Sequence, residues 1–188
     1  MKNFFAGIII GVLLIGGGFF FFTQHSQQKQ EVVKEVPTIV DTGYKNATYM
    51  IEDQPITLED GLSEIAVGHN AMSKITTKYF GNVASGDLNG DGVSDVAFLL
   101  TQEGGGSGTF YYVVAALKTP TGYQGSDAIL LGDRIAPQTT EIRNGEVIVN
   151  YADRKPTDPM TMTPSISMTK HLKISSDKGS GITLIEVK

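Results

Sequence analysis

Residues 96–117, VAFLLTQEGGGSGTFYYVVAAL, decide the fold class of this chain. Two apolar runs, Val96–Leu100 and Thr109–Leu117, flank a glycine-rich connection at Gly104–Gly108. Neither run alternates polar with apolar residues, so each is predicted to be a central strand that is covered on both faces. The connection lacks the Gly-Lys-Ser/Thr ending of a phosphate loop and precedes a strand, so it is expected to be a flexible hairpin loop and a contact surface.

Short strands and tight turns continue on both sides of this stretch. Asn144-Gly145 predicts a type I′ hairpin that pairs Arg143 with Glu146. Asp60-Gly61 predicts a second hairpin turn, and the proline-containing arm 154–164 is expected to be irregular. The remaining strands are expected at Ala47–Ile51, Ile56–Glu59, Leu62–Val67, Ile75–Phe80, Ala128–Leu131, Lys170–Ile174 and Ile182–Val187.

These patterns predict a mainly β fold for residues 47–188, either a single antiparallel sheet or a small sandwich. No long soluble helix is expected. The 188 residues carry a formal charge of −5 and no cysteine, which excludes disulfides, thiolate metal sites and a lipid-bearing cysteine. The mild acidity, with no basic stripe, argues against a nucleic-acid partner.

The N-terminus carries an unbroken apolar run from Phe4 to Phe22. Nineteen helical residues would span about 28 Å, close to the ~30 Å hydrocarbon core of a bilayer. A cleaved signal peptide is the alternative, but the run ends in four phenylalanines without a small-x-small cleavage site. Residues 1–22 are therefore expected to be an uncleaved transmembrane anchor, in which Gly7 and Gly11 form a G-x-x-x-G motif that also occurs without helix dimerisation.

Residues 23–46 are polar, rich in glutamine and of mixed charge, which is typical of a flexible tether. The long polar region follows the one hydrophobic segment of the sequence. The expected topology is therefore a single-pass membrane protein whose N-terminus is cytoplasmic and whose C-terminal domain lies outside the cytoplasm.

The stretch Asp87-Leu88-Asn89-Gly90-Asp91-Gly92-Val93-Ser94-Asp95 carries the clearest chemical signal. Oxygen-bearing side chains alternate with glycines, which allow the chain to curl around a hard cation that takes six to eight oxygen ligands. A metal would also relieve the repulsion between three nearby carboxylates. The alternative is a glycine-rich turn whose side chains cap backbone amides.

This spacing resembles the calcium loop of FG-GAP and VCBS-type repeats, in which the loop joins neighbouring strands of a sheet. The EF-hand loop fits less well, because its twelfth position requires a bidentate Glu and here holds Phe98. The resemblance implies side-chain ligands from Asp87, Asn89, Asp91 and Asp95 and a backbone carbonyl from Val93. Those families repeat the unit around a propeller, whereas this sequence has one copy, so a propeller is not expected.

A broader resemblance rests on Gly86–Gly92 with Asp95–Ala97, then Gly105–Tyr112, Leu131–Arg134 and Val149–Arg154. Together these stretches resemble a group of uncharacterised bacterial exported or membrane-anchored proteins with a single loop of this type. The resemblance implies a cell-envelope location and no particular activity. Residues 1–46 lie outside it.

Other candidate sites give weaker signals. His25, His69 and His171 are isolated, and no G-x-S-x-G elbow is present, so a zinc site or a nucleophilic enzyme is not expected. Asp133-Arg134 and Asp153-Arg154 follow strands and are interpreted as ion pairs or turn caps, with a polar recognition site between them as the alternative.

The sequence thus predicts a membrane-anchored extracytoplasmic β domain with one structural Ca²⁺, which acts as a binding or envelope-structure module and not as an enzyme. The expected partners are the membrane, through Phe4–Phe22, and an envelope protein. Two alternatives stay open: a cell-envelope hydrolase built from converging carboxylates, and a domain that stabilises a membrane partner through the anchor.

Overall fold

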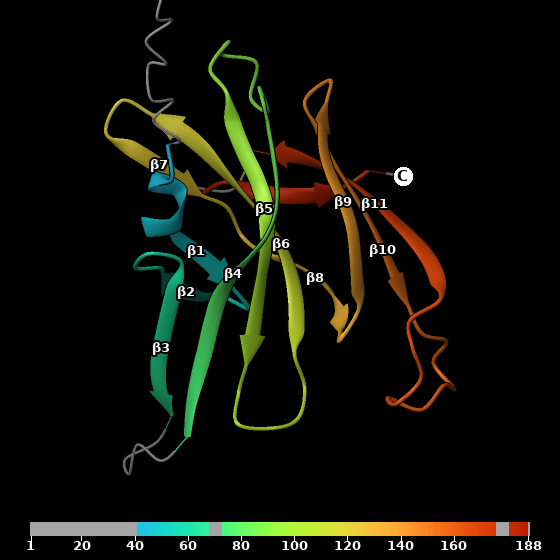
Figure 1. The fold of residues 1–188 in the computed structure, drawn as a ribbon. Coiled ribbons are helices and arrows are strands. Elements are labelled where there is room, and N and C mark those ends of the chain that lie inside the picture. The colour runs from blue at the N-terminus through green and yellow to red at the C-terminus, as the bar shows by residue number, and fades with distance from the viewer. Residues whose placement is uncertain (1–40, 68–72, 176–180, 188) are drawn as a thin grey trace, which may run out of the picture. The chain divides into compact units, whose positions relative to one another are not determined.

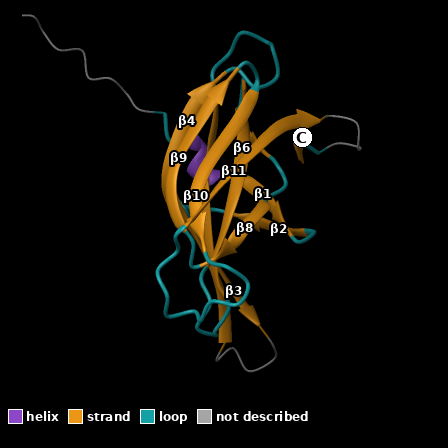
Figure 2. Ribbon diagram, turned by 90° about the vertical axis from the view of Figure 1, so that its right-hand side faces the viewer, coloured by secondary structure: helices purple, strands orange, loops and turns teal. Residues whose placement is uncertain are grey.

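Three antiparallel sheets make up the computed structural model, which describes residues 41–67, 73–175 and 181–187 (Figure 1). The predicted anchor Phe4–Phe22 and the tether up to residue 40 lie outside these ranges. Among the described residues, no helix has the length and apolar character needed to cross a bilayer. The mainly β fold class is confirmed, and Figure 2 shows the short helix η1 against a background of strands.

The largest sheet has six strands, with the order β3-β4-β5-β6-β7 and with β8 also paired to β6. The second sheet has four strands in the order β12-β11-β10-β9, and β1 and β2 form a two-stranded sheet. The elements are η1 (Gly43–Asn46), β1 (Thr48–Ile51), β2 (Gln54–Thr57), β3 (Leu62–Val67), β4 (Ser73–Gly86), β5 (Asp95–Glu103), β6 (Phe110–Thr119), β7 (Gly122–Gly125), β8 (Ile129–Asp133), β9 (Ala136–Arg143), β10 (Glu146–Asp153), β11 (Ile166–Ser175) and β12 (Thr183–Glu186).

Strands β5 and β6 form the predicted central hairpin, in which Phe98 pairs with Val114 and Leu99 with Val113. All four of these side chains are completely buried. Because successive residues of a strand point to opposite faces, complete burial of neighbours requires cover on both sides of the sheet. The prediction that these strands are covered on each face is therefore confirmed.

One face of the central hairpin packs against β1, β2 and η1. Phe98 lies at the centre of this layer, with its ring 5.1 Å from that of Tyr44 and 5.5 Å from that of Tyr49. Tyr44 belongs to η1, so residues 43–46, which composition assigns to the tether, form part of the folded domain.

The opposite face packs against the four-stranded sheet. Leu99 and Val113 of the central hairpin belong to the same buried cluster as Val149, Tyr151 and Leu172. The arrangement is therefore a sandwich of the six- and four-stranded sheets, with the two-stranded sheet covering the second face of the larger one.

The Asn144-Gly145 hairpin forms as predicted. Both turn residues have positive φ, 52° and 75°, and Arg143 pairs with Glu146. In contrast, β4 continues well beyond the predicted end at Phe80, up to Gly86. Its pairing with β5 shifts register around Gly81 and Asn82, so local bulges keep this glycine- and asparagine-containing stretch in the sheet.

The connection between β7 and β8 bonds to strands from both ends of the domain. The Met50 N–H of β1 donates to Ser126 O (3.1 Å), and the Ala128 N–H donates to Met50 O (2.8 Å). The Asp127 N–H donates to Ile182 O (3.0 Å), just before β12. This connector, residues 126–128, therefore joins β1 to the last strand through parallel bridges.

Candidate functional site

The predicted metal loop, residues 87–94, connects β4 to β5 and lies at the top of the molecule in Figure 1. Gly86 and Asp95 pair across its base, so the loop begins and ends on adjacent strands. Gly90 and Gly92 have φ values of 81° and 82°, in the left-handed region that residues with a Cβ rarely adopt. Glycines at these two positions therefore allow the curled path that the sequence predicts.

Asp87 organises the first half of the loop. The Gly90 N–H donates to its Oδ1 (2.7 Å), and the Gly92 N–H donates to its Oδ2 (2.9 Å). Hydrogen bonds from the backbone amides, above all that of Gly92, lower the pKa of Asp87 below its ordinary value, because they stabilise the ionised form. The carboxylate therefore stays charged at neutral pH.

Asn89 and Asp91 form the second half of the loop through similar short-range contacts. The Asp91 N–H donates to Asn89 Oδ1 (3.0 Å), and the Val93 N–H donates to Asp91 Oδ1 (2.7 Å). Asn89 Nδ2 also donates to Asp91 Oδ2 (3.0 Å). Both residues are exposed, so their oxygens remain accessible from solvent.

Asp95 differs from the other predicted ligands because its side chain is completely buried. The Leu88 N–H donates to its Oδ2 (2.9 Å), and the Lys118 N–H at the far end of β6 donates to its Oδ1 (2.8 Å). One carboxylate therefore fixes the loop to two strands of the central sheet. The sequence predicted Asp95 as a metal ligand or as a cap of backbone amides in the loop, but it did not predict the bridge to β6.

The loop thus shows the amide-capping contacts of the alternative interpretation. No group of three or more His, Cys, Asp or Glu side chains is placed to hold a metal ion within the described ranges. These hydrogen bonds leave the carboxylates able to bind a metal ion, because a carboxylate offers about four lone-pair directions across its two oxygens. Asp87, Asn89, Asp91 and the Val93 carbonyl present the oxygen chemistry that Ca²⁺ takes. Their assignment as ligands, and that of Asp95, stays a prediction.

The Asp133-Arg134 and Asp153-Arg154 pairs lie close together, as the recognition-site alternative requires. Arg154 Nη1 donates to Arg134 O (2.9 Å), and its Nε donates to Met162 O in the irregular arm. Arg154 therefore holds the arm against the turn after β8. Sequence reasoning missed Met162, because a backbone acceptor in an irregular segment leaves no signal in the sequence.

A hollow of about 270 Å³ beside these residues is lined by Asp133, Asp153 and Asp158, together with Arg154, Lys155, Pro156 and Met160. Desolvation raises the pKa of Asp133, but hydrogen bonds from Arg134 and from the Thr109 N–H outweigh it and leave a lowered pKa. Asp153 Oδ1 accepts the Arg154 N–H (2.7 Å). Asp133 therefore has the contacts of an ion pair with Arg134, and Asp153 has that of a turn cap.

A second hollow, of about 400 Å³, lies next to the acidic loop and was not predicted. It is lined by Asp41, Ser85, Val93, Ser94, Val96, Lys118 and Tyr123. Lys118 pairs with Asp41, and its Nζ lies 4.4 Å from the centre of the Tyr123 ring. The hydrogen bond that Lys118 donates to the Asp41 carboxylate raises the pKa of Lys118, so this amine stays protonated.

Of the three histidines, the described ranges contain His171, on β11 at 3.5 Å from Glu146.

No family model, curated protein or solved structure matches the chain.

Proposed function

We propose that residues 41–187 are a binding or envelope-structure module held outside the cytoplasm by the anchor Phe4–Phe22, and that loop 87–95 holds one structural Ca²⁺. The observation that carries the proposal is the attachment of this loop to the central sheet through buried Asp95. An ion at such a loop would stiffen the entry to β5, the most buried strand of the fold.

Three properties of the loop support calcium. The exposed candidate ligand atoms of the loop are oxygens, which hard cations prefer. The Asp87 carboxylate has a lowered pKa and is ionised at neutral pH. The turns at Gly90 and Gly92 are already formed, so binding requires little ordering of the backbone.

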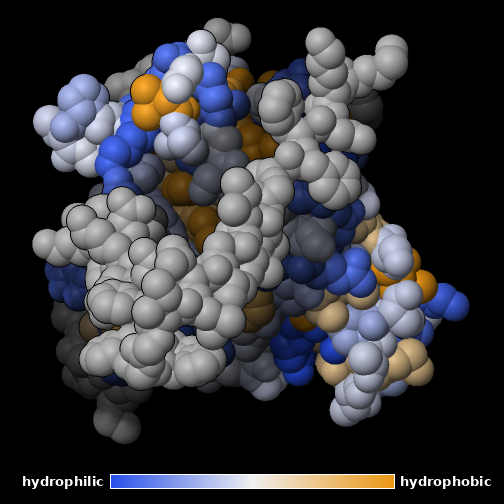
Figure 3. Space-filling model, turned by 45° about the horizontal axis from the view of Figure 1, so that its top comes forward, coloured by the Kyte–Doolittle hydropathy of each residue, from blue (hydrophilic) through white to orange (hydrophobic). Residues whose placement is uncertain are grey.

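The outer face of the four-stranded sheet is covered by paired polar side chains, as expected for the water-exposed surface of such a module. Asn150 Nδ2 donates to Thr139 Oγ1 (2.9 Å) and the Thr169 hydroxyl donates to Asn150 Oδ1 (2.8 Å), which links three strands through side chains. Glu146 pairs with Lys173 on the same face (3.1 Å). Figure 3, which looks toward the end of the molecule that carries the acidic loop, shows hydrophilic and hydrophobic residues interspersed.

The cell-envelope hydrolase remains the second candidate, because the 270 Å³ hollow collects three carboxylates. A general acid requires a raised pKa, whereas the pKa of Asp133 is lowered by its contacts with Arg134 and Thr109. The direction of this shift favours a structural role for Asp133. Hydrolysis of an envelope polysaccharide by the purified protein, abolished by Asp153→Asn, would instead establish the enzyme.

Calcium is expected to raise the midpoint of thermal unfolding of the full chain in mild detergent. A ligand at 100 times its Kd stabilises the native state by about 2.7 kcal/mol, which for a domain of this size is a shift of roughly 5–10 °C. Far-UV circular dichroism in 1 mM CaCl₂, compared with chelator, measures the shift. Asp91→Ala is expected to abolish it.

Glu186→Ala is the matched control for this experiment, because Glu186 is an acidic residue whose exposed ion pair with Lys170 adds little stability. This variant should keep the full calcium response. An unchanged midpoint at millimolar calcium, or an Asp91→Ala variant that responds like the parent, would contradict the calcium assignment.

The anchor can be tested independently of calcium. The intact mass of the protein extracted from membranes is expected to include Phe4–Phe22, because the run lacks a cleavage signal. A mature N-terminus that begins after Phe22 would show that the segment is a cleaved signal peptide.

Treatment of whole cells with protease should remove the C-terminal domain if it lies outside the cytoplasm.

A further inference from the structure

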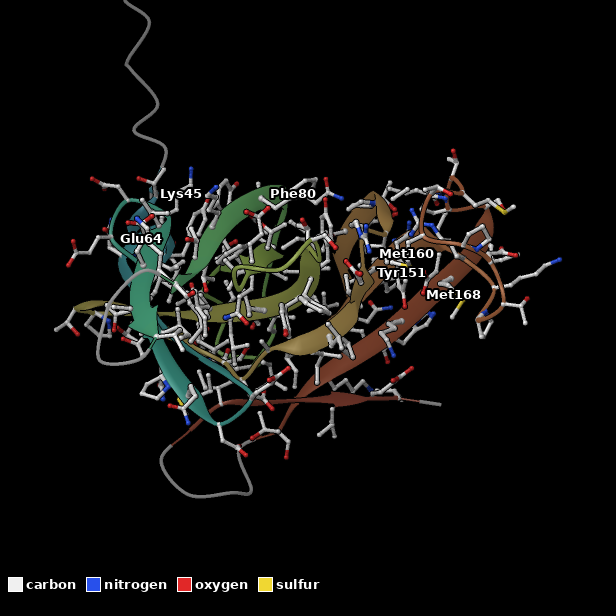
Figure 4. The ribbon with its side chains drawn as sticks, turned by 90° about the horizontal axis from the view of Figure 1, so that it is seen from below. Lys45, Glu64, Phe80, Tyr151, Met160 and Met168 are labelled. Atoms are coloured by element: carbon white, nitrogen blue, oxygen red, sulfur yellow. The ribbon has the colours of Figure 1, made fainter. Side chains whose placement is uncertain are left out.

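Strand β3, Leu62–Val67, ends the six-stranded sheet on one side (Figure 1). It pairs with β4 along its whole length, and among the described strands none pairs with its outer side. Such an edge presents unpaired backbone donors and acceptors to a second strand. In Figure 4, Glu64 lies on β3 at the outer margin of the ribbon.

The hydrogen bonds at the start of β3 define which of its backbone groups face outward. Leu62 exchanges both of its backbone hydrogen bonds with Glu59, on the side away from β4. In an antiparallel strand the direction of these groups alternates from residue to residue. The N–H and C=O groups of Glu64 and Ala66 therefore point away from β4.

The two faces of β3 differ in character. On one face Ile65 pairs with Ile75 of β4 and is 41% exposed, and Val67 is 49% exposed. Both isoleucines line a hollow of about 200 Å³ together with Ile51 and Ile56 of the two-stranded sheet. On the other face Lys74 Nζ bonds to Glu64 Oε2 (2.9 Å).

We propose that β3 pairs antiparallel with β3 of a second copy of this chain, across a two-fold axis at Ile65. Glu64 of each copy then faces Ala66 of the other, which uses the outward backbone groups in four hydrogen bonds. Ile65 of one copy faces Ile65 of the other as a non-hydrogen-bonded pair, where side chains approach most closely. The two β3 strands join the two six-stranded sheets into one.

Side-chain chemistry selects this register. Because Ile65 already pairs with Ile75, the joined sheet carries an unbroken row of four isoleucines, two from each copy. On the opposite face each Glu64 meets the small Ala66, and the adjacent Lys74 balances its charge. Moving the axis to Glu64 would place two carboxylates directly opposite each other, which is destabilising.

A hollow borders the first residues of the outer edge of β3. It has a volume of about 350 Å³ and is lined by Thr57, Glu59, Leu62, Ser63 and Glu64. In the proposed register Val67 of the other copy faces Ser63 at this hollow. Five paired residues form a small interface, so the dimer is expected to be weak in dilute solution and favoured where chains are concentrated.

Cysteine crosslinking of the full chain tests the register, since the natural sequence contains no cysteine. In the proposed dimer the two residues at position 65 come within the range of a disulfide. Ile65→Cys in mild detergent is expected to form a covalent dimer under oxidising conditions, at least tenfold faster than Val83→Cys, a comparably exposed position on β4 (46%). Val67→Cys alone is expected to form no disulfide-linked dimer, because Val67 of each copy faces Ser63 of the other.

An equimolar mixture of Ser63→Cys and Val67→Cys chains is expected to crosslink, although neither variant does so alone. This result cannot arise from association through the N-terminal segment alone. Equal rates for Ile65→Cys and Val83→Cys, or a Val67→Cys homodimer that forms as fast as the Ile65→Cys one, would overturn the proposal.

Sedimentation velocity of Ile65→Lys provides a second measurement. Two lysines facing each other across the axis should lower the dimer fraction at least tenfold. The circular dichroism spectrum should stay that of the parent, because Ile65 is 41% exposed and lies outside the buried core. A parent chain that remains monomeric at every concentration up to 200 μM would overturn the proposal. Pairing of this edge with a strand of a different protein would not rescue it.

Discussion

Asp95→Ala is expected to lower the free energy of unfolding by about 4 kcal/mol. The variant loses two hydrogen bonds to a carboxylate, each with a typical contribution of about 1.5–3 kcal/mol. It also leaves the amides of Leu88 and Lys118 without their acceptors in a site where the Asp95 side chain has no exposure. Urea denaturation followed by far-UV circular dichroism, in the presence of a calcium chelator, measures the loss.

Two variants separate this effect from metal binding. Asp95→Asn keeps an oxygen for one of the two amides and should lose roughly half as much stability. Asp91→Ala removes an exposed carboxylate and should change stability by less than about 1 kcal/mol without calcium. If Asp95→Ala were as stable as Asp91→Ala under these conditions, the bridging role of Asp95 would be wrong.

Gly125→Ala is expected to destabilise the domain by about 3 kcal/mol and to lower its unfolding midpoint by roughly 6–12 °C. A Cβ at this position would lie 2.3 Å from the backbone oxygen of Thr48 and 2.6 Å from the ring of Tyr49. Tyr49 is completely buried, and β1 is hydrogen-bonded to the next residue, Ser126, so neither neighbour can move cheaply. Differential scanning calorimetry gives the midpoint.

Gly106→Ala is the matched control for this substitution. Gly106 lies in the β5–β6 loop, and a Cβ there would have no neighbour within 4 Å. Its stability should stay within about 0.5 kcal/mol of the parent. A Gly125→Ala variant that unfolds at the temperature of Gly106→Ala would contradict the close approach of β7 to β1.

Local sequence patterns predicted the central hairpin because the apolar residues of its two strands themselves determine that both strands are buried. Val96–Leu100 and Val113–Ala116 are apolar at every position, and short runs of this kind beside a glycine-rich connection are typical of strands covered on both faces. The Asn144-Gly145 turn was predicted for a similar reason, since few residues other than asparagine and glycine tolerate the positive φ of both positions.

Long-range pairing accounts for what could not be predicted. The continuation of β4 through Gly81 and Asn82 depends on its partner β5, whereas these two residues in isolation favour a turn. The position of Tyr44 in the core depends on Phe98, more than fifty residues away. In the acidic loop, the spacing predicted the curled path that Gly90 and Gly92 allow, but the contact between Asp95 and Lys118 required knowledge that β6 ends beside β5.

The connector at residues 126–128 has a consequence for the order in which the strands fold. Its backbone bonds β1 on one side and Ile182 on the other, and Asp127 Oδ1 accepts the Leu184 N–H (2.5 Å). Contacts between residues this far apart in sequence form late, because the intervening chain must first be closed. The contacts around β1 are therefore completed only after β12 has joined the fold, although β1 precedes it by more than 130 residues.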